Sequence, residues 1–158
     1  MNNTTSELPL RMGVGIVLLN SDNHIFVGKR IDNPKKFWQM PQGGVEKNEG
    51  LFKAAKRELE EETGIKSVEL IKELDEWIEY YLPKNLLGKV WKGKYKGQKQ
   101  KWFVMKFLGN DEEINIKTKH PEFLEWKWIE VDKLTEVVVD FKLNVYKDVK
   151  EKVKKLLI

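Results

Sequence analysis

Three glutamates at helical spacing are the residues whose type and position most clearly indicate chemistry. Glu58, Glu61 and Glu62 fall within RELEEE (57–62), and residues three and four apart lie on one face of an α-helix. Like charges at this spacing repel, and the C-terminal end of a helix disfavours anions by roughly 0.3–1 kcal/mol each. A solvated acidic face is the structural alternative. A bound divalent cation would turn the repulsion into attraction, and carboxylates suit Mg²⁺ or Mn²⁺, so the pattern predicts a metal site.

The helix that must present these glutamates is predicted over residues 50–63. Leu51, Ala55 and Leu59 recur at four-residue spacing, which gives the helix one apolar face for packing. Gly64 follows the last turn, where glycine often ends a helix because it adopts a left-handed conformation without strain. The glutamates are therefore expected on the polar face, near the helix C-terminus.

The glutamates belong to a longer motif. Residues 43–65 read GGVEKNEGLFKAAKRELEEETGI, and they fill every fixed position of the signature G-x5-E-x7-R-E-U-x-E-E-x-G-U, with U a bulky apolar residue. The chain therefore resembles the Nudix hydrolase family. The resemblance implies an α/β fold, namely a Nudix-type α/β/α sandwich with a mixed β-sheet. It also implies metal-dependent cleavage of a phosphoanhydride in a nucleoside diphosphate linked to a further group.

The order of the predicted elements also favours an α/β sandwich. Strands are predicted over 12–19, 24–30, 37–40, 100–108 and 125–131, with a long alternating stretch over 68–81, an exposed loop or hairpin tip over 84–99, and a C-terminal helix over 143–157. Strands with one early and one terminal helix indicate a mixed sheet covered by helices. We expect a single domain over residues 1–158, with the signature at 43–65.

Composition excludes several functions. The 158 residues contain no cysteine, which excludes disulfides, thiolate catalysis and cysteine-type zinc sites. The N-terminal MNNTTSELPL lacks a signal-peptide pattern, and the apolar run 14–19 is too short to span a membrane. We therefore expect a cytoplasmic protein without a membrane partner. A net charge of +4 and a pI of about 9.0 mildly favour polyanionic partners.

Segments outside the signature resemble a narrower group, the bacterial RNA pyrophosphohydrolases and the related dinucleoside polyphosphate hydrolases. These segments are RMGVGIVLLN (11–20), FWQMPQGGV (37–45), GQKQKWFVMKF (97–107), HPEFLEWKWIEVDKL (120–134) and VVVDFKLNVY (137–146). The chain departs from the group at Met12, where proline is expected, and in the lysine-rich stretch 84–96. The resemblance implies removal of pyrophosphate from 5′-triphosphorylated RNA, which leaves a 5′-monophosphate and promotes RNA decay. The alternative substrate is a dinucleoside polyphosphate of the Ap5A or Ap4A type.

The resemblance also implies roles for individual residues. Catalytic and metal-binding roles fall to Glu58, Glu61, Glu62 and Glu122, with the main-chain carbonyl of Gly43 as a further metal ligand. Contacts to phosphate or RNA are implied for Arg11, Arg30, Gln42, Lys101, Val139 and Phe141. Structural roles are implied for Glu49 and Arg57, which would pair to brace the loop before the helix, and for Gly64. The implied cofactor is Mg²⁺, with Mn²⁺ as the alternative.

These roles have plainer alternatives. Glu122 follows a proline as a loop residue would, Phe141 sits where an aromatic is usually core, and Arg11 and Arg30 suit solvated strand ends. Neither His24 nor His120 shows a partner pattern, so neither is assigned a role. A cluster of basic residues and aromatics suits either single-stranded nucleic acid or a plain charged hairpin. Its members are Lys84, Lys89, Lys92, Lys94, Lys96, Lys99, Lys101, Trp91, Tyr95 and Trp102.

Two other functions fit the sequence less well. A binding module that has lost catalysis is opposed by the intact glutamates, because such a module has no reason to keep a costly acidic cluster. A hydrolase of mononucleotides or ADP-ribose is disfavoured, because the tryptophan-rich C-terminal half shows no resemblance to those groups. We expect a monomer whose partner is RNA or a dinucleoside polyphosphate, with no DNA partner.

Overall fold

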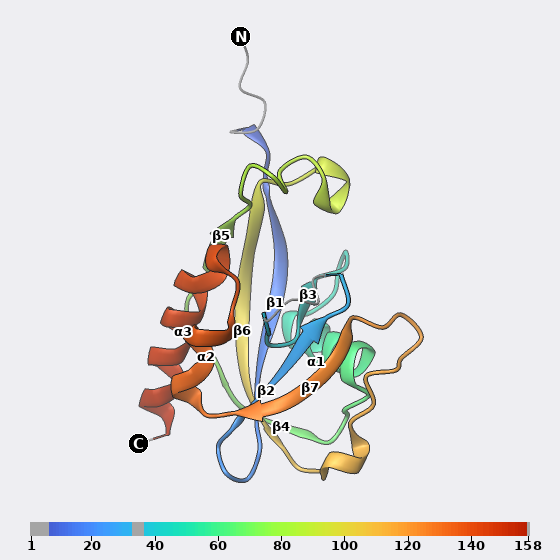
Figure 1. The fold of residues 1–158 in the computed structure, drawn as a ribbon, viewed down its shortest axis with the longest axis vertical. Coiled ribbons are helices and arrows are strands. Elements are labelled where there is room, and N and C mark those ends of the chain that lie inside the picture. Colours follow the sequence, from blue (N-terminus) through green and yellow to red (C-terminus); the bar gives the residue numbers. More distant parts are fainter. Residues whose placement is uncertain (1–6, 33–36, 158) are drawn as a thin grey trace.

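A mixed seven-stranded sheet forms the centre of the structure, a computed structural model that describes residues 7–32 and 37–157. The long strands β1 (Leu10–Leu19) and β6 (Gly97–Phe107) run parallel as neighbours along their whole lengths. Every other pair of strands is antiparallel. Neighbouring strands of the sheet have the order β4-β6-β1-β2-β7. Figure 1 shows the long strands β6 and β1 side by side at the centre of the molecule.

The remaining strands are short and attach to this frame. Their bounds are β2 (Ile25–Arg30), β3 (Gln42–Gly44), β4 (Val68–Glu73), β5 (Ile78–Tyr81) and β7 (Phe123–Ile129). The short strand β3 pairs with β1, and β5 pairs with the first half of β6. β1 thus places β3, and with it the start of the signature, beside the middle of the sheet.

Helices cover both sides of the sheet because β1 and the second half of β6 carry buried apolar residues on both faces. Helix α1 (Leu51–Thr63) packs on one face, in a buried cluster that includes Ile16 and Phe103. Helix α3 (Leu143–Leu156), preceded by the short α2 (Leu134–Val137), packs on the other face, in a cluster that includes Val17 and Trp102. Figure 1 shows the resulting three layers. The predicted α/β/α sandwich with a mixed β-sheet is confirmed.

Most predicted elements form, with shifted ends. The strands predicted over 12–19 and 24–30 and the helices over 50–63 and 143–157 are confirmed. The stretch 68–81 is divided at Leu74–Trp77, and its two halves pair with different parts of β6. The last strand begins at Phe123 and ends at Ile129, earlier at both ends than predicted.

Two predictions are wrong. The strand over 37–40 does not form: only Gln39 makes a bridge, to Gly28, and Pro41 lacks the N–H that a continuing ladder needs. Regular pairing resumes at β3. The exposed tip does not extend to residue 99, because Gly97 already begins β6 through its pairs with Leu10 and Tyr81. The rest of that segment forms turns and the 3-10 turn Val90–Gly93.

The helices also bear on the membrane question. Within residues 7–32 and 37–157, none is long and apolar enough to cross a bilayer. The argument against a signal peptide rests largely on residues 1–6, which lie outside the described residues.

Candidate active site

Strand β3 passes close to helix α1 at Gly43, where a side chain would meet the carboxylate of Glu58. A Cβ atom at Gly43 would lie 2.0 Å from Cδ of Glu58 and 2.1 Å from its Oε2. Any larger residue would displace this carboxylate, so the glycine permits the close approach of helix and strand. The helix then ends at Gly64, with φ 74° and its N–H donating to the Glu60 carbonyl at 2.8 Å.

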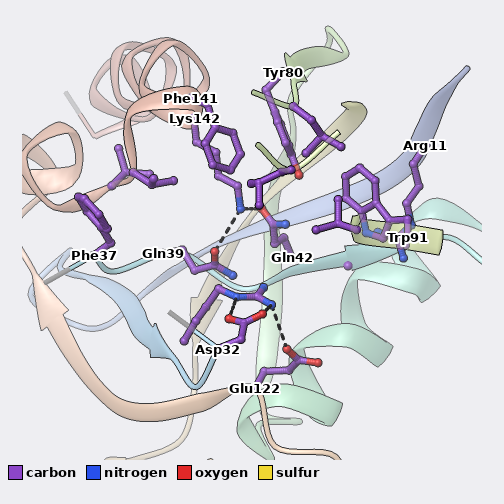
Figure 2. Close-up of a pocket in the computed structure, with 18 of the residues that line it drawn as sticks. Arg11, Asp32, Phe37, Gln39, Gln42, Tyr80, Trp91, Glu122, Phe141 and Lys142 are labelled. Atoms are coloured by element: carbon purple, nitrogen blue, oxygen red, sulfur yellow. Dashed lines mark hydrogen bonds and ion pairs between the residues drawn. The ribbon is translucent and has the colours of Figure 1, made fainter. Parts of the chain in front are cut away.

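A cavity of about 720 Å³ opens along β3 and the C-terminal half of α1 (Figure 2). It brings together most residues for which the sequence implied a role, namely Arg11, Arg30, Gln42, Gly43, Glu58, Glu61, Glu62, Glu122, Val139 and Phe141. Glu122 comes from the segment before β7, and its carbonyl accepts a hydrogen bond from the Ile31 N–H at 2.9 Å. The acidic cluster, as we call Glu58, Glu61, Glu62 and Glu122, is therefore assembled from two distant segments.

Glu62 is the buried member of the acidic cluster. Only 5% of the residue is exposed, and its Oε2 has no hydrogen-bond partner. Burial raises the pKa of Glu62 well above its ordinary value, and the nearby carboxylates of Glu58 and Glu122 raise it further. A buried carboxylate without a full set of partners is costly. The site therefore favours a proton or a cation at this position.

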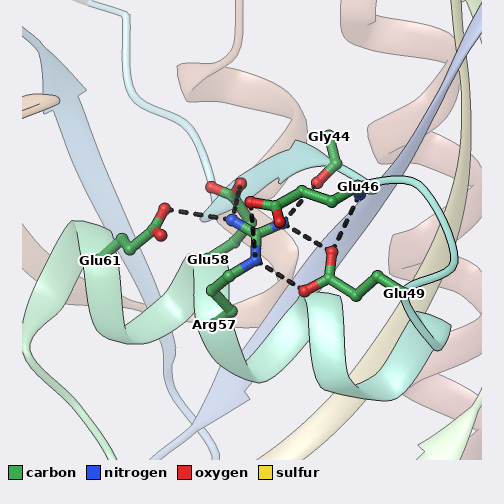
Figure 3. A network of polar contacts seen from close by, with 6 residues as sticks. All are labelled: Gly44, Glu46, Glu49, Arg57, Glu58 and Glu61. Atoms are coloured by element: carbon green, nitrogen blue, oxygen red, sulfur yellow. Dashed lines mark hydrogen bonds and ion pairs between the residues drawn. The ribbon is translucent and has the colours of Figure 1, made fainter.

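Arg57 braces the loop that precedes α1 (Figure 3). Its Nε and Nη2 donate to the two carboxylate oxygens of Glu49 at 2.7 and 2.9 Å, and Nη2 also donates to the Gly44 carbonyl at 2.9 Å. The bonds from Arg57, followed by the Glu46 N–H, lower the pKa of Glu49 to about 2. The arginine thus ties both ends of the segment 44–49 to the helix.

The same guanidinium also reaches the acidic cluster. Nη1 of Arg57 donates to Glu58 at 2.9 Å and to Glu61 at 3.2 Å. Burial nevertheless raises the pKa of Glu58, because desolvation of this carboxylate outweighs its bond to Arg57. Glu58 is therefore a candidate proton acceptor as well as a candidate ligand.

On the opposite side, Arg30 faces the cluster. It forms a two-pronged pair with Asp32, with Nε–Oδ1 2.7 Å and Nη2–Oδ2 2.6 Å, and its Nη2 lies 3.7 Å from Glu122. The hydrogen bonds between them raise the pKa of Arg30 and lower that of Asp32. The sequence reading did not single out Asp32, since a carboxylate in a turn after a strand carries no specific signal.

The cluster fits a divalent cation by the chemistry of its donors. Among the described residues, no three acidic or histidine side chains converge closely enough to enclose a cation as they stand. Two of the carboxylates, those of Glu58 and Glu61, accept hydrogen bonds from Arg57. A cation would compete with this arginine for the carboxylates, and the unpartnered Oε2 of Glu62 would gain a partner.

A second groove of about 490 Å³ lies beyond the acidic cluster and shares all four of its carboxylates. Thr118, Lys119 and His120 complete its lining, together with Arg57 and Glu60. The four carboxylates thus stand between an aromatic and basic cavity on one side and a polar groove on the other. A substrate lying across them would have its two ends in different surroundings.

Part of the cavity lining is aromatic. The rings of Tyr80 and Phe141 lie 5.8 Å apart at 47° and form an aromatic wall (Figure 2). Val139 and Trp91 also line the cavity. Phe141 is partly buried and packs on the core cluster of α3 while it also lines the cavity. Phe141 therefore belongs to the core and also faces the cavity, and its contact with RNA stays a prediction.

Lys142 is a cavity residue that the sequence reading missed. It is 7% exposed, and its Nζ donates to Gln39 at 3.2 Å and to Gln42 at 3.5 Å. Burial, followed by the charge of Arg30, lowers the pKa of Lys142 to about 7. A lysine beside an amphipathic helix is usually exposed. Here the 3-10 turn Asp140–Lys142 directs it inward, and only its apolar neighbours in the sequence hinted at burial.

Lys101 does not line the cavity. Its Nζ donates to the Asp75 carbonyl at 2.7 Å and lies 3.7 Å from Glu73. Successive residues of a strand point to opposite faces, so Gln100 lies on the other side of β6, where it is buried and its amide donates to the cavity residue Gln42 at 3.1 Å. The interpretation of Trp102 as a nucleic-acid contact is wrong, because this residue is fully buried.

Comparison with known proteins identifies the family. Residues 9–149 match the family model described as the NUDIX domain. The chain belongs to the Nudix family. This Nudix protein is 69% identical to an RNA pyrophosphohydrolase of Pelagibacter ubique, over 99% of both chains. It is 50% identical to an RNA pyrophosphohydrolase of Roseobacter denitrificans, over 89% of both chains.

Solved structures support the Nudix fold. The E. coli dihydroneopterin triphosphate pyrophosphohydrolase superposes with a TM-score of 0.70 at 21% identity, over 89% of this chain and 96% of that one. A C. elegans Ap4A hydrolase superposes with a TM-score of 0.64 at 18% identity, over 92% and 97% of the chains. At these identities the likeness shows the fold and does not extend to the substrate.

Proposed function

We propose that this protein is an RNA pyrophosphohydrolase that removes pyrophosphate from the 5′ end of triphosphorylated RNA and leaves a 5′-monophosphate. The observation that carries the proposal is one cavity in which the acidic cluster adjoins an aromatic and basic wall. The full-length similarity to enzymes of that name supports it. The chain acts as a single domain over residues 1–158, as a cytoplasmic monomer, and opens transcripts to degradation.

The acidic cluster is the proposed metal site, with Mg²⁺ as the preferred ion and the Gly43 carbonyl as a further ligand. Nudix hydrolases generally need a divalent metal. When bound, such an ion neutralises phosphate oxygens and lowers the pKa of a water molecule. The raised pKa values of Glu58 and Glu62 suit either carboxylate to accept the proton of the attacking water.

The cationic and aromatic residues orient the substrate. Phosphoryl transfer depends mainly on positioning and on electrostatic stabilisation. Arg11, Arg30 and Gln42 line the cavity next to the acidic cluster, where the phosphates must lie. Phe141 and Val139 line the cavity and offer an apolar surface to the first bases of the RNA.

The test compares two substrates in one assay. Release of phosphate and pyrophosphate is measured from a short 5′-triphosphorylated RNA, with Mg²⁺ and with chelator, beside diadenosine pentaphosphate. The expected result is metal-dependent conversion of the RNA to its monophosphorylated form. Turnover of the dinucleotide alone would keep the Nudix chemistry but replace RNA as the substrate. Absence of metal-dependent turnover on either would indicate a binding module.

A further inference from the structure

The guanidinium of Arg11 lies over the ring of Trp91 in the wall of the cavity (Figure 2). Its Cζ is 5.2 Å from the ring centroid, within the range of cation–π attraction. The two residues come from β1 and from the 3-10 turn Val90–Gly93, and both line the cavity. Arg11 also packs on β3, since a Cβ atom at Gly44 would lie 2.2 Å from its Nη2.

Arg11 and Arg30 differ in how they are held. Arg30 is neutralised by the two oxygens of Asp32 at 2.7 and 2.6 Å. In the described part of the chain, no carboxylate forms an ion pair with Arg11, and the ring of Trp91 is the partner that restrains it. A π face holds a guanidinium without cancelling its charge. Arg11 therefore keeps its positive charge available to an anion in the cavity.

The backbone at Trp91 adopts an unfavourable conformation. Trp91 (φ 51°, ψ 35°) and Lys92 (φ 58°, ψ 25°) are consecutive non-glycine residues in the left-handed region, which is unfavourable and is kept only where the surroundings enforce it. The ring of Tyr95 packs edge-on against that of Trp91, with centroids 6.0 Å apart at 80°. The end of the segment is tied to the residue that precedes β1, because the Lys96 N–H donates to the Pro9 carbonyl at 3.1 Å. The strained turn thus points the indole at Arg11.

We propose that Trp91 is a positioning residue that holds the Arg11 guanidinium in place to bind a phosphate group at the 5′ end of the substrate. The proposal rests on the proposed function of the cavity. Trp91 restricts the long arginine side chain before the substrate arrives, which reduces the loss of side-chain entropy on binding. Its effect is therefore on substrate affinity, and it acts through Arg11.

Two substitutions of Trp91, by leucine and by phenylalanine, distinguish the effect of the aromatic face from that of apolar packing. Trp91→Leu fills space without a π face, and Trp91→Phe keeps one. Trp91→Leu is expected to raise KM for triphosphorylated RNA about 3- to 10-fold with kcat within about twofold, from the usual strength of a cation–π contact. Trp91→Phe should stay near the wild-type KM. Trp77→Leu is the matched control, because Trp77 contacts Lys99 and Lys101 outside the cavity.

A double substitution tests whether Trp91 acts through Arg11. With Arg11→Ala already present, Trp91→Leu should leave KM unchanged. If Trp91→Leu raises KM equally in the wild type and in Arg11→Ala, the ring contacts the substrate directly. If Trp91→Leu alone leaves KM unchanged, Trp91 has no role in binding. Either result overturns the proposal. The same KM values are measured with diadenosine pentaphosphate, which also carries a polyphosphate. If the wild-type enzyme cleaves the dinucleotide but not RNA, the RNA function is refuted. The KM values for the dinucleotide then still test whether Trp91 positions Arg11.

Discussion

Arg57 joins Glu49, in the loop of the Nudix signature, to Glu58, in its helix. Its Nε lies 2.7 Å from Oε2 of Glu49, and its Nη1 lies 2.9 Å from Oε1 of Glu58. Glu49 is almost entirely enclosed, with 8% of its side chain exposed. One planar guanidinium therefore fixes the loop before α1 and orients a carboxylate of the acidic cluster.

Arg57→Lys tests this double role, because lysine keeps the charge but loses the planar fork. We expect a loss of about 1–3 kcal/mol in the free energy of unfolding, as for hydrogen bonds to charged groups, and a lower kcat. Thermal unfolding and turnover of the same preparation measure the two effects. Arg57→Lys with wild-type stability and turnover would show that the fork is dispensable.

Glu62→Gln tests the buried carboxylate. The substitution is nearly isosteric and removes the charge, so we expect turnover to fall by at least about 100-fold. The folded state raises the pKa of Glu62, so ionised Glu62 destabilises the folded state at neutral pH. This penalty disappears below the pKa that Glu62 has in the unfolded chain, because the carboxyl is then protonated in both states. In chelator, Glu62→Gln should therefore melt above the wild type at neutral pH, and the difference should vanish on acidification.

Glu151→Gln, an exposed change on α3, is the control for Glu62→Gln. It should alter neither turnover nor the pH dependence of melting. Addition of Mg²⁺ should raise the melting temperature of the wild type and of Glu151→Gln, and should raise that of Glu62→Gln less. Full turnover by Glu62→Gln would remove Glu62 from the reaction.

The acidic face of α1 was predictable because it lies within one helix. Periodicity alone places Glu58, Glu61 and Glu62 on one side, and the signature adds Glu49 and Arg57 at fixed intervals. Glu122 was reached only through resemblance. No local pattern shows that the segment before β7 passes the end of α1, since that depends on the pairing of β2 with β7.

The cavity wall was less predictable because it depends on small changes of backbone direction. The alternation of side chains along β6 directs Lys101 to Asp75 and Gln100 to Gln42, and the 3-10 turn before α3 buries Lys142. Trp91 lies in a segment whose left-handed backbone no propensity scale anticipates. Which of these side chains reach the cavity follows only from the folded backbone and the register of its strands.

Phe141→Ala tests the aromatic wall. Stacking of a base on an aromatic ring contributes about 1–3 kcal/mol, so we expect kcat/KM on triphosphorylated RNA to fall about 5- to 100-fold. A short substrate such as a nucleoside triphosphate should lose less, because it offers fewer bases to the wall. Equal losses on both substrates would instead indicate that Phe141 supports the fold through its contact with Tyr80.

Lys142→Met tests the buried lysine. Folding lowers the pKa of Lys142 from 10.5 to about 7, chiefly through burial, so the unfolded chain binds more protons between these values and the free energy of unfolding rises with pH. Methionine has no such penalty. Lys142→Met should therefore melt above the wild type near pH 7, and the gap should close as the pH approaches about 10. Lys147→Met, an exposed change on α3, is the control and should follow the wild type.

On RNA, Lys142→Met should raise KM, because the ammonium that faces Gln42 in the cavity is lost. A gap in melting temperature that does not change with pH would show that Lys142 is not destabilised by burial.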